Sequence, residues 1–372
     1  MFEDTAPSTT HFPLAPDDFA LIRAHASASD EAGMLTPELQ ELIHTRGWMR
    51  MLAPAAAGGG EWALPRAVRL CEALAAADGS MGWTVTLCAG AGWFAGFLEE
   101  DFARTLLETP ELCVGGCGAP AGYADVEGDG YRLSGRWDFA TGAPMTTHFT
   151  LNAILRDHGA PLLDSAGRAR SSSFIVPAEM VWVHETWRCT GLRATASHTF
   201  SIDNVWLSKQ HAFELRPECA VAPGALYRFP FLTLAYVTLA ANLAGMAAGF
   251  LQLAESIIER RRHPLLDEPL TALPQTRGAL DAAHAGLAGA RRLFYDLLET
   301  MWDEVCAGKA IAEEATRRLH LASLAMVDAA RRAVDEVYPF CGLHAADVQS
   351  EIGRMWRDLH TATQHKMMLP LP

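Results

Sequence analysis

The spacing of hydrophobic residues changes twice along the chain and divides it into three parts. Between residue 17 and about residue 108, apolar side chains recur at three- and four-residue intervals, as at Leu39, Leu42 and Ile43, which is typical of amphipathic helices. From about residue 112 to residue 205 the interval shortens to two, with glycine, aspartate and proline between short apolar runs, which predicts strands. From about residue 230 long helical runs return, interrupted at Pro264 and Pro274.

This order of elements predicts an α+β protein whose helices and strands lie in separate layers. We expect an N-terminal α-helical domain at residues 1–110, a central antiparallel β domain (a barrel or sandwich) at residues 111–215, and a C-terminal helical bundle at residues 216–372. The clearest strand candidates are residues 147–153, 173–176, 181–185 and 198–207.

Composition narrows the class of protein. The formal net charge of −14 over 372 residues argues against nucleic acid or an anionic membrane as a partner. The eight cysteines are scattered, and Cys113 and Cys117 have no histidine cluster or second cysteine pair at metal spacing, which predicts reduced thiols and no metal site. The N-terminal residues lack a secretory pattern, and polar residues interrupt the apolar run at residues 229–246. We therefore expect a cytoplasmic protein in which that run is a buried helix.

The most informative segment is Gly128–Ala143, with the sequence GDGYRLSGRWDFATGA. Its apolar and polar residues alternate as in a half-buried strand pair, and the second strand ends at Thr141 and Gly142. The segment resembles the flavin-contacting strand of the acyl-CoA dehydrogenase superfamily, and is most similar to the branch that hydroxylates small molecules with reduced flavin. The resemblance implies that Trp137, Phe139, Thr141 and Gly142 bind the cofactor.

A second motif runs from Trp187 to Phe200 and leads into a predicted strand. It resembles the turn in the same superfamily that lies along the flavin ring. By this resemblance Thr195 and Ser197 are cofactor-binding donors, although Ala194 stands where the family has glycine.

The third motif, Gly353–His365, resembles the superfamily's last long helix. Acyl-CoA dehydrogenases carry a proton-abstracting glutamate just beyond this helix, whereas this chain has no acidic side chain after Asp358. In the oxygenase branch a histidine at this step faces the flavin, and His365 is the residue that matches. His360 lies further round the helix and is the weaker candidate, assigned with Trp83 and Trp93 to the substrate pocket.

The missing glutamate distinguishes between two reaction types. Removal of an α-proton from a thioester requires a strong, desolvated carboxylate base, whereas an imidazole suits deprotonating or orienting a phenol or amine. The resemblance then implies oxygenation through a flavin C4a-hydroperoxide, with His365 and Thr141 as the catalytic residues and O2 as co-substrate. The substrate would be a small aromatic, amine or sugar-like molecule.

Phosphate recognition is expected at the end of a basic run. The sequence from Arg260 to Pro264, with Gln275 downstream, resembles the signature where the superfamily binds flavin phosphates, often across a subunit boundary. Arg261 and Gln275 are the candidates, and a solvated basic helix end is an equally good interpretation. FMN and FAD are not distinguished. Relatives assemble as dimers of dimers, which implies a homo-oligomer, a dimer or a tetramer.

The absence of a convincing nicotinamide-binding motif bears on where the electrons come from. Residues 116–121 fit G-x-G-x-x-A, but Pro120 and Gly122 prevent a helix from starting there, so no nicotinamide-binding domain is expected. A separate flavin reductase would supply the reduced flavin. Two alternatives stay open: an acyl-CoA dehydrogenase or oxidase with a relocated base, and a catalytically silent relative that binds a ligand or partner.

Overall fold

A computed structural model describes residues 14–369 of the chain. The prediction of no secretory signal concerns residues that mostly lie outside this part. The first described part is a layer of helices joined by turns and short 3-10 segments. These helices are α1 (Pro16–Ala32), α2 (Pro37–Thr45), α3 (Leu64–Ala77), α4 (Gly79–Gly92) and α5 (Glu100–Leu107).

The central part is one sheet of eight strands in the order β6-β7-β2-β1-β3-β5-β8, with β4 paired to β3. The strands are β1 (Val114–Glu127), β2 (Gly130–Ala140), β3 (His148–Asp157), β4 (Ala160–Pro161), β5 (Ser171–Pro177), β6 (Trp182–His184), β7 (His198–Ser208) and β8 (Ala212–Phe213). The described pairs are antiparallel, as predicted, except that β1 and β3 are parallel. This exception arises because β2 turns back along one edge of β1, and the chain then crosses to the other edge.

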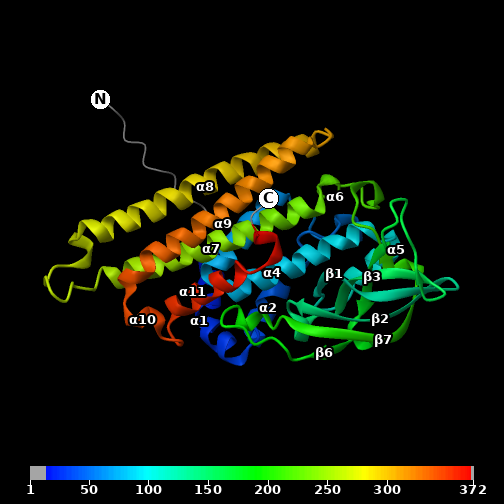
Figure 1. Ribbon diagram of the computed structural model, residues 1–372, viewed down its shortest axis with the longest axis horizontal. Helices are drawn as coiled ribbons and strands as arrows, with labels where there is room; N and C mark the ends of the chain where they lie inside the picture. The colour runs from blue at the N-terminus through cyan, green and yellow to red at the C-terminus, as the bar shows by residue number, and fades with distance from the viewer. Residues whose placement is uncertain (1–13, 370–372) are drawn as a thin grey trace.

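The C-terminal part is a bundle of long helices. Its members are α6 (Ala225–Arg228), α7 (Phe231–Ile258), α8 (Pro274–Cys306), α9 (Glu313–Cys341), α10 (Leu343–Ala346) and α11 (Glu351–Ala362). Figure 1 shows the sheet at one end of the molecule and α9 lying between α8 and α7. The loop that joins α7 to α8 lies at the end of the bundle away from the sheet.

Helix α7 joins the first and last layers into one core. It is long and apolar enough to cross a membrane, but 89% of its most apolar window is buried inside the fold, which confirms the predicted buried helix. It packs tightly on α3, because a Cβ at Gly245 would lie 2.1 Å from the Glu72 carbonyl oxygen. A second, smaller core lies within the sheet around Trp137, Phe149 and Phe200.

The α+β fold class is therefore confirmed, with helices before and after a sheet. The rejected G-x-G-x-x-A stretch lies inside β1 and starts no helix, as expected. All eight cysteines are free thiols. No group of residues suited to a metal ion occurs within residues 14–369. The domain boundaries stay predictions.

Candidate functional site

The end of β2 turns one aromatic ring inward and the next outward. Strict alternation would put Trp137 and Phe139 on the same face of the sheet, but a pairing irregularity lies between Trp137 and Ala140 and Phe139 has a φ of 67°. The indole of Trp137 is fully buried, stacks on Phe200 and donates its N–H to the Asn152 carbonyl oxygen at 2.9 Å. The Phe139 ring is 69% exposed, 6.2 Å from the ring of Trp187.

The three hydroxyl groups that the sequence assigns to cofactor binding lie together just beyond the end of β2. Thr141, Thr195 and Ser197 are all nearly buried, with Thr141 5% exposed. The Thr141 and Ser197 hydroxyl oxygens are 3.0 Å apart, and those of Ser197 and Thr195 are 2.7 Å apart. The Thr195 hydroxyl also donates to the Leu192 carbonyl oxygen at 2.8 Å. The backbone joins the two segments as well, since the Gly142 amide donates to the Thr195 carbonyl oxygen at 2.8 Å.

The turn that carries Thr195 has an unusual backbone. Leu192 and Ala196 have φ angles of 52° and 43°, in the left-handed region that side chains seldom adopt. Ala194, which replaces the glycine of the family motif, is buried within this turn. Such a turn needs external support, and α11 supplies it.

Helix α11 holds the turn at three consecutive residues. The Arg357 guanidinium donates to the Thr190 carbonyl oxygen at 3.0 Å, and the Gly191 amide donates to the Thr361 hydroxyl at 3.1 Å. The Leu192 amide donates to a carboxylate oxygen of Asp358 at 2.6 Å. A Cβ at Gly191 would lie 2.1 Å from the Arg357 carbonyl oxygen, so only glycine fits at this contact.

Asp358 belongs to a buried group of charges. Its side chain is fully buried, and Arg354 and Asp78 beside it form an ion pair at 3.3 Å. Burial, followed by the charge of Asp78, raises the pKa of Asp358 to about 8, although the hydrogen bond from Leu192 opposes the shift. A proton on this carboxyl group at neutral pH limits the negative charge that is buried here.

His365 follows α11 and lies against α4. Its ring is 5.9 Å from the indole of Trp83 in an edge-to-face arrangement. Its Nδ1 accepts a long hydrogen bond of 3.4 Å from the Met367 amide, which caps the next turn. Burial, and secondarily Lys366, lowers the pKa of His365 below its ordinary value of 6.5. The imidazole is therefore neutral at pH 7.

Two other predicted pocket residues lie elsewhere in the fold. The His360 ring is 4.2 Å from that of Trp356, and its Nε2 lies 3.1 Å from an Asp335 carboxylate oxygen of α9. Trp93 lies in the core, where its N–H donates to the Leu226 carbonyl oxygen at 3.1 Å. The structure thus brings Trp83 to His365, but it places His360 and Trp93 in other surroundings.

The two predicted phosphate-binding residues lie at the far end of the bundle. Arg261 follows α7 and donates to the Phe340 carbonyl oxygen at 3.0 Å, while Gln275 is exposed in the first turn of α8. The α7–α8 loop is remote from the sheet (Figure 1), so a single chain does not bring these residues to Thr141.

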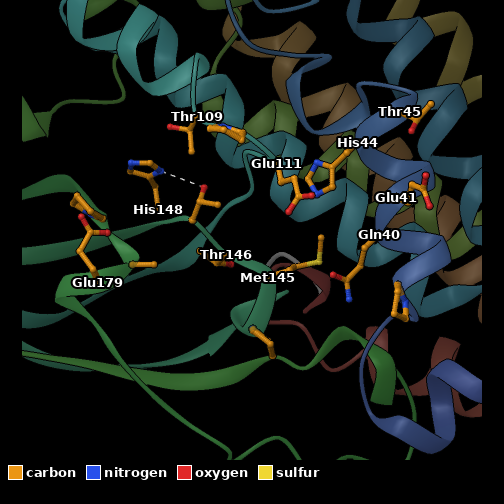
Figure 2. A pocket seen from close by; sticks show the side chains of 16 residues that line it. Gln40, Glu41, His44, Thr45, Thr109, Glu111, Met145, Thr146, His148 and Glu179 are labelled. Carbon is orange, nitrogen blue, oxygen red and sulfur yellow. Dashed lines mark hydrogen bonds between the residues drawn. The ribbon is translucent and has the colours of Figure 1, made fainter.

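A large cavity was not predicted from the sequence. It measures about 1070 Å³ and lies between α2 and the start of β3 (Figure 2). Burial lowers the pKa of both His44 and His148, while Glu111 and Glu179 partly oppose this. The residues that line this cavity come from distant segments of the sequence, and none of them stands out in its local pattern. The periodicity of the sequence therefore gave no signal for the cavity.

A much smaller cavity adjoins the hydroxyl groups. Its volume is about 10 Å³, roughly the space of one water molecule. Thr84, Gly142 and Thr195 are among its lining residues, and it shares Met145 with the larger cavity. The Thr84 hydroxyl is 1% exposed and has no hydrogen-bond partner within residues 14–369.

These features fit the predicted flavin. Its ring system needs a flat apolar neighbour and polar groups along its edge. The exposed ring of Phe139, beside Trp187, offers the first of these. The hydroxyl of Thr141, and the buried, unpaired hydroxyl of Thr84 near Gly142, offer the second.

Comparisons with known proteins agree with this arrangement. Residues 237–370 match the family model "Acyl-CoA dehydrogenase, C-terminal domain". The chain is 24% identical over 347 residues to an indole-3-acetate monooxygenase from Acinetobacter baumannii, covering 93% of this chain and 87% of that protein. It is 30% identical over 241 residues to the oxygenase component of an FADH2-dependent resorcinol hydroxylase from a Rhizobium species, covering 62% and 57%.

Solved structures show the same fold. The HsaA monooxygenase from M. tuberculosis superposes with a TM-score of 0.86 at 20% identity, covering 95% of this chain and 91% of that one. XiaF from a Streptomyces species, in complex with FADH2 and glycerol, also gives 0.86, at 19% identity and with 94% and 89% covered. The C-terminal part of the chain therefore matches the acyl-CoA dehydrogenase C-terminal domain, and the chain as a whole is similar to proteins named as monooxygenases and has the fold of two of them.

Proposed function

We propose that this protein is the oxygenase component of a two-component flavin-dependent monooxygenase that acts on a small aromatic molecule. Whole-chain similarity to monooxygenases supports the reaction class, and the aromatic compounds in the names of two relatives support the substrate class. FADH2 occurs in the names of a relative and of a structural neighbour, so FAD is the first cofactor to test. A separate reductase would supply it.

One observation carries the proposal. A half-buried, neutral imidazole, His365, lies where the dehydrogenase motif leads to a glutamate, and no acidic side chain follows Asp358 in the sequence. The buried carboxyl group nearby in sequence, Asp358, is already bonded to the Leu192 amide. These residues suit oxygenation better than abstraction of an α-proton.

The bound cofactor would supply the two electrons with which one atom of O2 enters the product and the other becomes water. The chain contributes positioning and exclusion of water. Because Nδ1 of His365 accepts the Met367 amide, its proton lies on Nε2 in the neutral form, and Nε2 can donate to a substrate oxygen or nitrogen. Thr141 lies at the edge of the proposed flavin site, and the packed rings of Trp83 and His365 exclude solvent.

The remaining predicted residues suggest an assembly of several copies. Arg261 and Gln275 would reach a flavin phosphate only in a neighbouring copy, since they lie remote from Thr141 in their own chain. The proposed enzyme is therefore a homo-oligomer, and we propose that it is cytoplasmic, as expected from its sequence.

The test is incorporation of isotopically labelled O2. The purified protein, FAD, a flavin reductase and a panel of phenols and indoles are incubated, and the products are examined by mass spectrometry. One labelled oxygen atom per product, dependent on this protein, supports the proposal. Oxidised flavin and hydrogen peroxide as the sole products with every compound, at the rate of the reductase alone, would refute it.

A further inference from the structure

The large cavity between α2 and the start of β3 adjoins the much smaller cavity beside Thr84. Gln40, Pro144 and Met145 line both cavities. The Thr84 hydroxyl is 1% exposed and has no partner in the part of the chain that the structure describes. A buried hydroxyl group without a partner is costly, so it points to a ligand that supplies one. The two cavities therefore mark a route from the surface to the edge of the proposed flavin site.

The junction between the two cavities has one adaptable member. The Gln40 side-chain amide donates to the Leu35 carbonyl oxygen at 2.8 Å, which holds Gln40 in place. The ring of Pro144 is rigid, whereas Met145 is half-buried, unbranched and flexible. Figure 2 shows the side chains of Gln40 and Met145 next to each other. Because the inner cavity measures only about 10 Å³, an aromatic molecule reaches Thr84 only after Met145 moves.

The lining of the large cavity is acidic and carries no positive charge at neutral pH. Three glutamates, Glu41, Glu111 and Glu179, contribute carboxylates, and none of the described lining residues is lysine or arginine. Burial lowers the pKa of His44 and of His148, so both imidazoles are neutral at pH 7. An anion that enters this cavity therefore meets three charges of its own sign.

This lining excludes some occupants and suits others. The phosphate groups of a flavin would find carboxylates and no lining cation, so they do not fit here. Arg50 is not among the lining residues, and its guanidinium donates to the Thr109 carbonyl oxygen at 2.7 Å. The volume of about 1070 Å³ is ample for a bicyclic aromatic molecule. Apolar surface for such a ring comes from several lining residues: Pro37, Pro110, Pro144, Met145, Pro177 and Ala178.

We propose that this cavity is the entrance chamber for the substrate, that Met145 is its inner gate, and that its carboxylates select neutral or cationic aromatic molecules over aromatic carboxylates. This inference rests on the proposed function, because it names the substrate class of the same site. The carboxylates come from both walls, with Glu41 on α2 and Glu179 after β5, so they act on a molecule before it reaches Thr84. The chain thereby differs from its relative named for indole-3-acetate, which is a carboxylate.

The first experiment compares two aromatic molecules of nearly equal shape, indole-3-acetamide and indole-3-acetate. Dissociation constants are measured anaerobically with the protein holding FADH2, and kcat/KM is measured from labelled product. We expect the wild type to favour the amide by at least about tenfold at low salt, because the cavity repels the anion. Raising the salt concentration to about 0.5 M should reduce the difference, since salt screens exposed charges.

A triple variant removes the selecting charges. It should lose most of the preference, chiefly because the carboxylate binds more tightly; its substitutions are Glu41→Gln, Glu111→Gln and Glu179→Gln. A matched control changes the net charge by the same amount through exposed glutamates outside the cavity and should keep the preference; its substitutions are Glu31→Gln, Glu259→Gln and Glu313→Gln. Thermal unfolding of both variants checks that they are folded.

The gate is tested by the size of the side chain at residue 145. Met145→Phe fills the junction with a stiffer ring and should lower kcat/KM several-fold, while affinity for FADH2 changes far less. Met145→Ala widens the junction and should raise kcat/KM. Values equal to that of the wild type in both variants would overturn the route past Met145.

The outcomes separate this inference from the proposed function. Equal affinity of the wild type for the amide and the carboxylate, or a preference that survives in the triple variant, overturns the selection even if labelled product forms. Failure of the wild type to bind either compound overturns it as well. Absence of labelled product with every compound overturns the proposed function, while the binding preference still decides the selection. A preference that is lost in the triple variant and kept in the control supports the inference.

Discussion

At the residue scale, hydrogen-bond capacity decides what each side chain can contribute. His365 has one nitrogen engaged by the Met367 amide, so the other carries the proton of the neutral ring. This arrangement favours an orienting donor over a base, although both roles are compatible with the sequence. The two roles make different predictions for substitutions of this residue.

We expect His365→Ala to lower the rate of product formation by about a hundredfold, because a positioned hydrogen-bonding group is lost. Binding of reduced flavin should change by less than about threefold, since Trp83 and the Thr141 and Ser197 hydroxyl groups remain. His365→Gln, whose amide can donate from nearly the same place as Nε2, should retain more activity than His365→Ala. The rate of product formation and the product yield per O2 consumed are measured for both variants. Equal turnover in His365→Ala and the wild type would remove the residue from the mechanism.

The pH dependence follows from the lowered pKa of the same residue. Protonation leaves the Nε2 proton in place, but it replaces the Nδ1 lone pair with an N–H that faces the Met367 amide and so displaces the ring from its donating position. Product formation should therefore fall on the acid side, with a midpoint below 6.5, as the pH drops through the lowered pKa. A rate profile between about pH 5 and pH 8 measures this. An acid limb that persists in His365→Gln would assign it to another group.

At the element scale, α11 joins the parts of the site. It holds the 190–192 segment of the turn through Arg357, Thr361 and Asp358, and His365 follows at its C-terminal end. One helix thus sets the position of the turn that carries Thr195 relative to the imidazole.

Asp358→Asn tests this link through stability. The pKa of Asp358 is raised from 3.8 to about 8 in the folded protein, so its contribution to stability is fully present below 3.8 and is lost as the pH rises through about 8. Asparagine still accepts from Leu192 but cannot ionise. Between about pH 6 and pH 9, wild-type stability should fall by about 2–3 kcal/mol more than that of Asp358→Asn. Urea unfolding at both pH values measures this, and parallel changes in the two proteins would contradict it.

A second buried contact holds α8 against α3. Glu72 is 2% exposed and accepts hydrogen bonds from Arg291 at 2.6 Å and from the Tyr295 hydroxyl at 2.5 Å. Glu72→Ala leaves the guanidinium partly buried without its partner and should cost about 3–5 kcal/mol of unfolding free energy. The matched control is Glu299→Ala, since its pair with Arg69 is far more exposed and should cost at most about 1 kcal/mol. Similar losses in the two variants would contradict this account.

At the scale of the whole molecule, three segments far apart in the sequence meet at one site. The sequence alone predicted that Thr141, Thr195 and Ser197 would share a site, because two specific motifs carried them, and the structure brings them together. The sequence also assigned His365 to the flavin site and Trp83 to the substrate pocket, and the structure places their rings 5.9 Å apart. Short motifs with several fixed positions are informative because each position constrains the same turn.

Other features depended on contacts that the pattern does not encode. The alternation put Trp137 and Phe139 on one face, but a strand irregularity with a positive φ separates them. In the sequence Asp358 looks like an ordinary charged residue on a helix surface. Its role in holding the turn depends on Leu192, which is 166 residues away. The surroundings of the His360 side chain are determined by its contact with α9, which the spacing of residues along its own helix does not reveal.

The remote position of the predicted phosphate-binding residues yields a prediction about assembly. If a neighbouring copy supplies Arg261, then Arg261→Ala should weaken flavin binding roughly tenfold, because a bidentate contact with phosphate is lost. Arg262→Ala is the control, since that side chain is exposed and paired with Asp267. Flavin titration combined with sedimentation measures affinity and oligomeric state together. A monomer that binds flavin equally well in both variants would contradict this prediction.

The most direct test of the central claim is rapid mixing of the protein, loaded anaerobically with FADH2, with oxygenated buffer. The account predicts that oxidised flavin reappears much more slowly than from free FADH2, because the closed site around Thr141 and His365 excludes water, and that a suitable phenol or indole is oxygenated meanwhile. Reoxidation at the rate of free FADH2, with all the oxygen recovered as hydrogen peroxide, would contradict it.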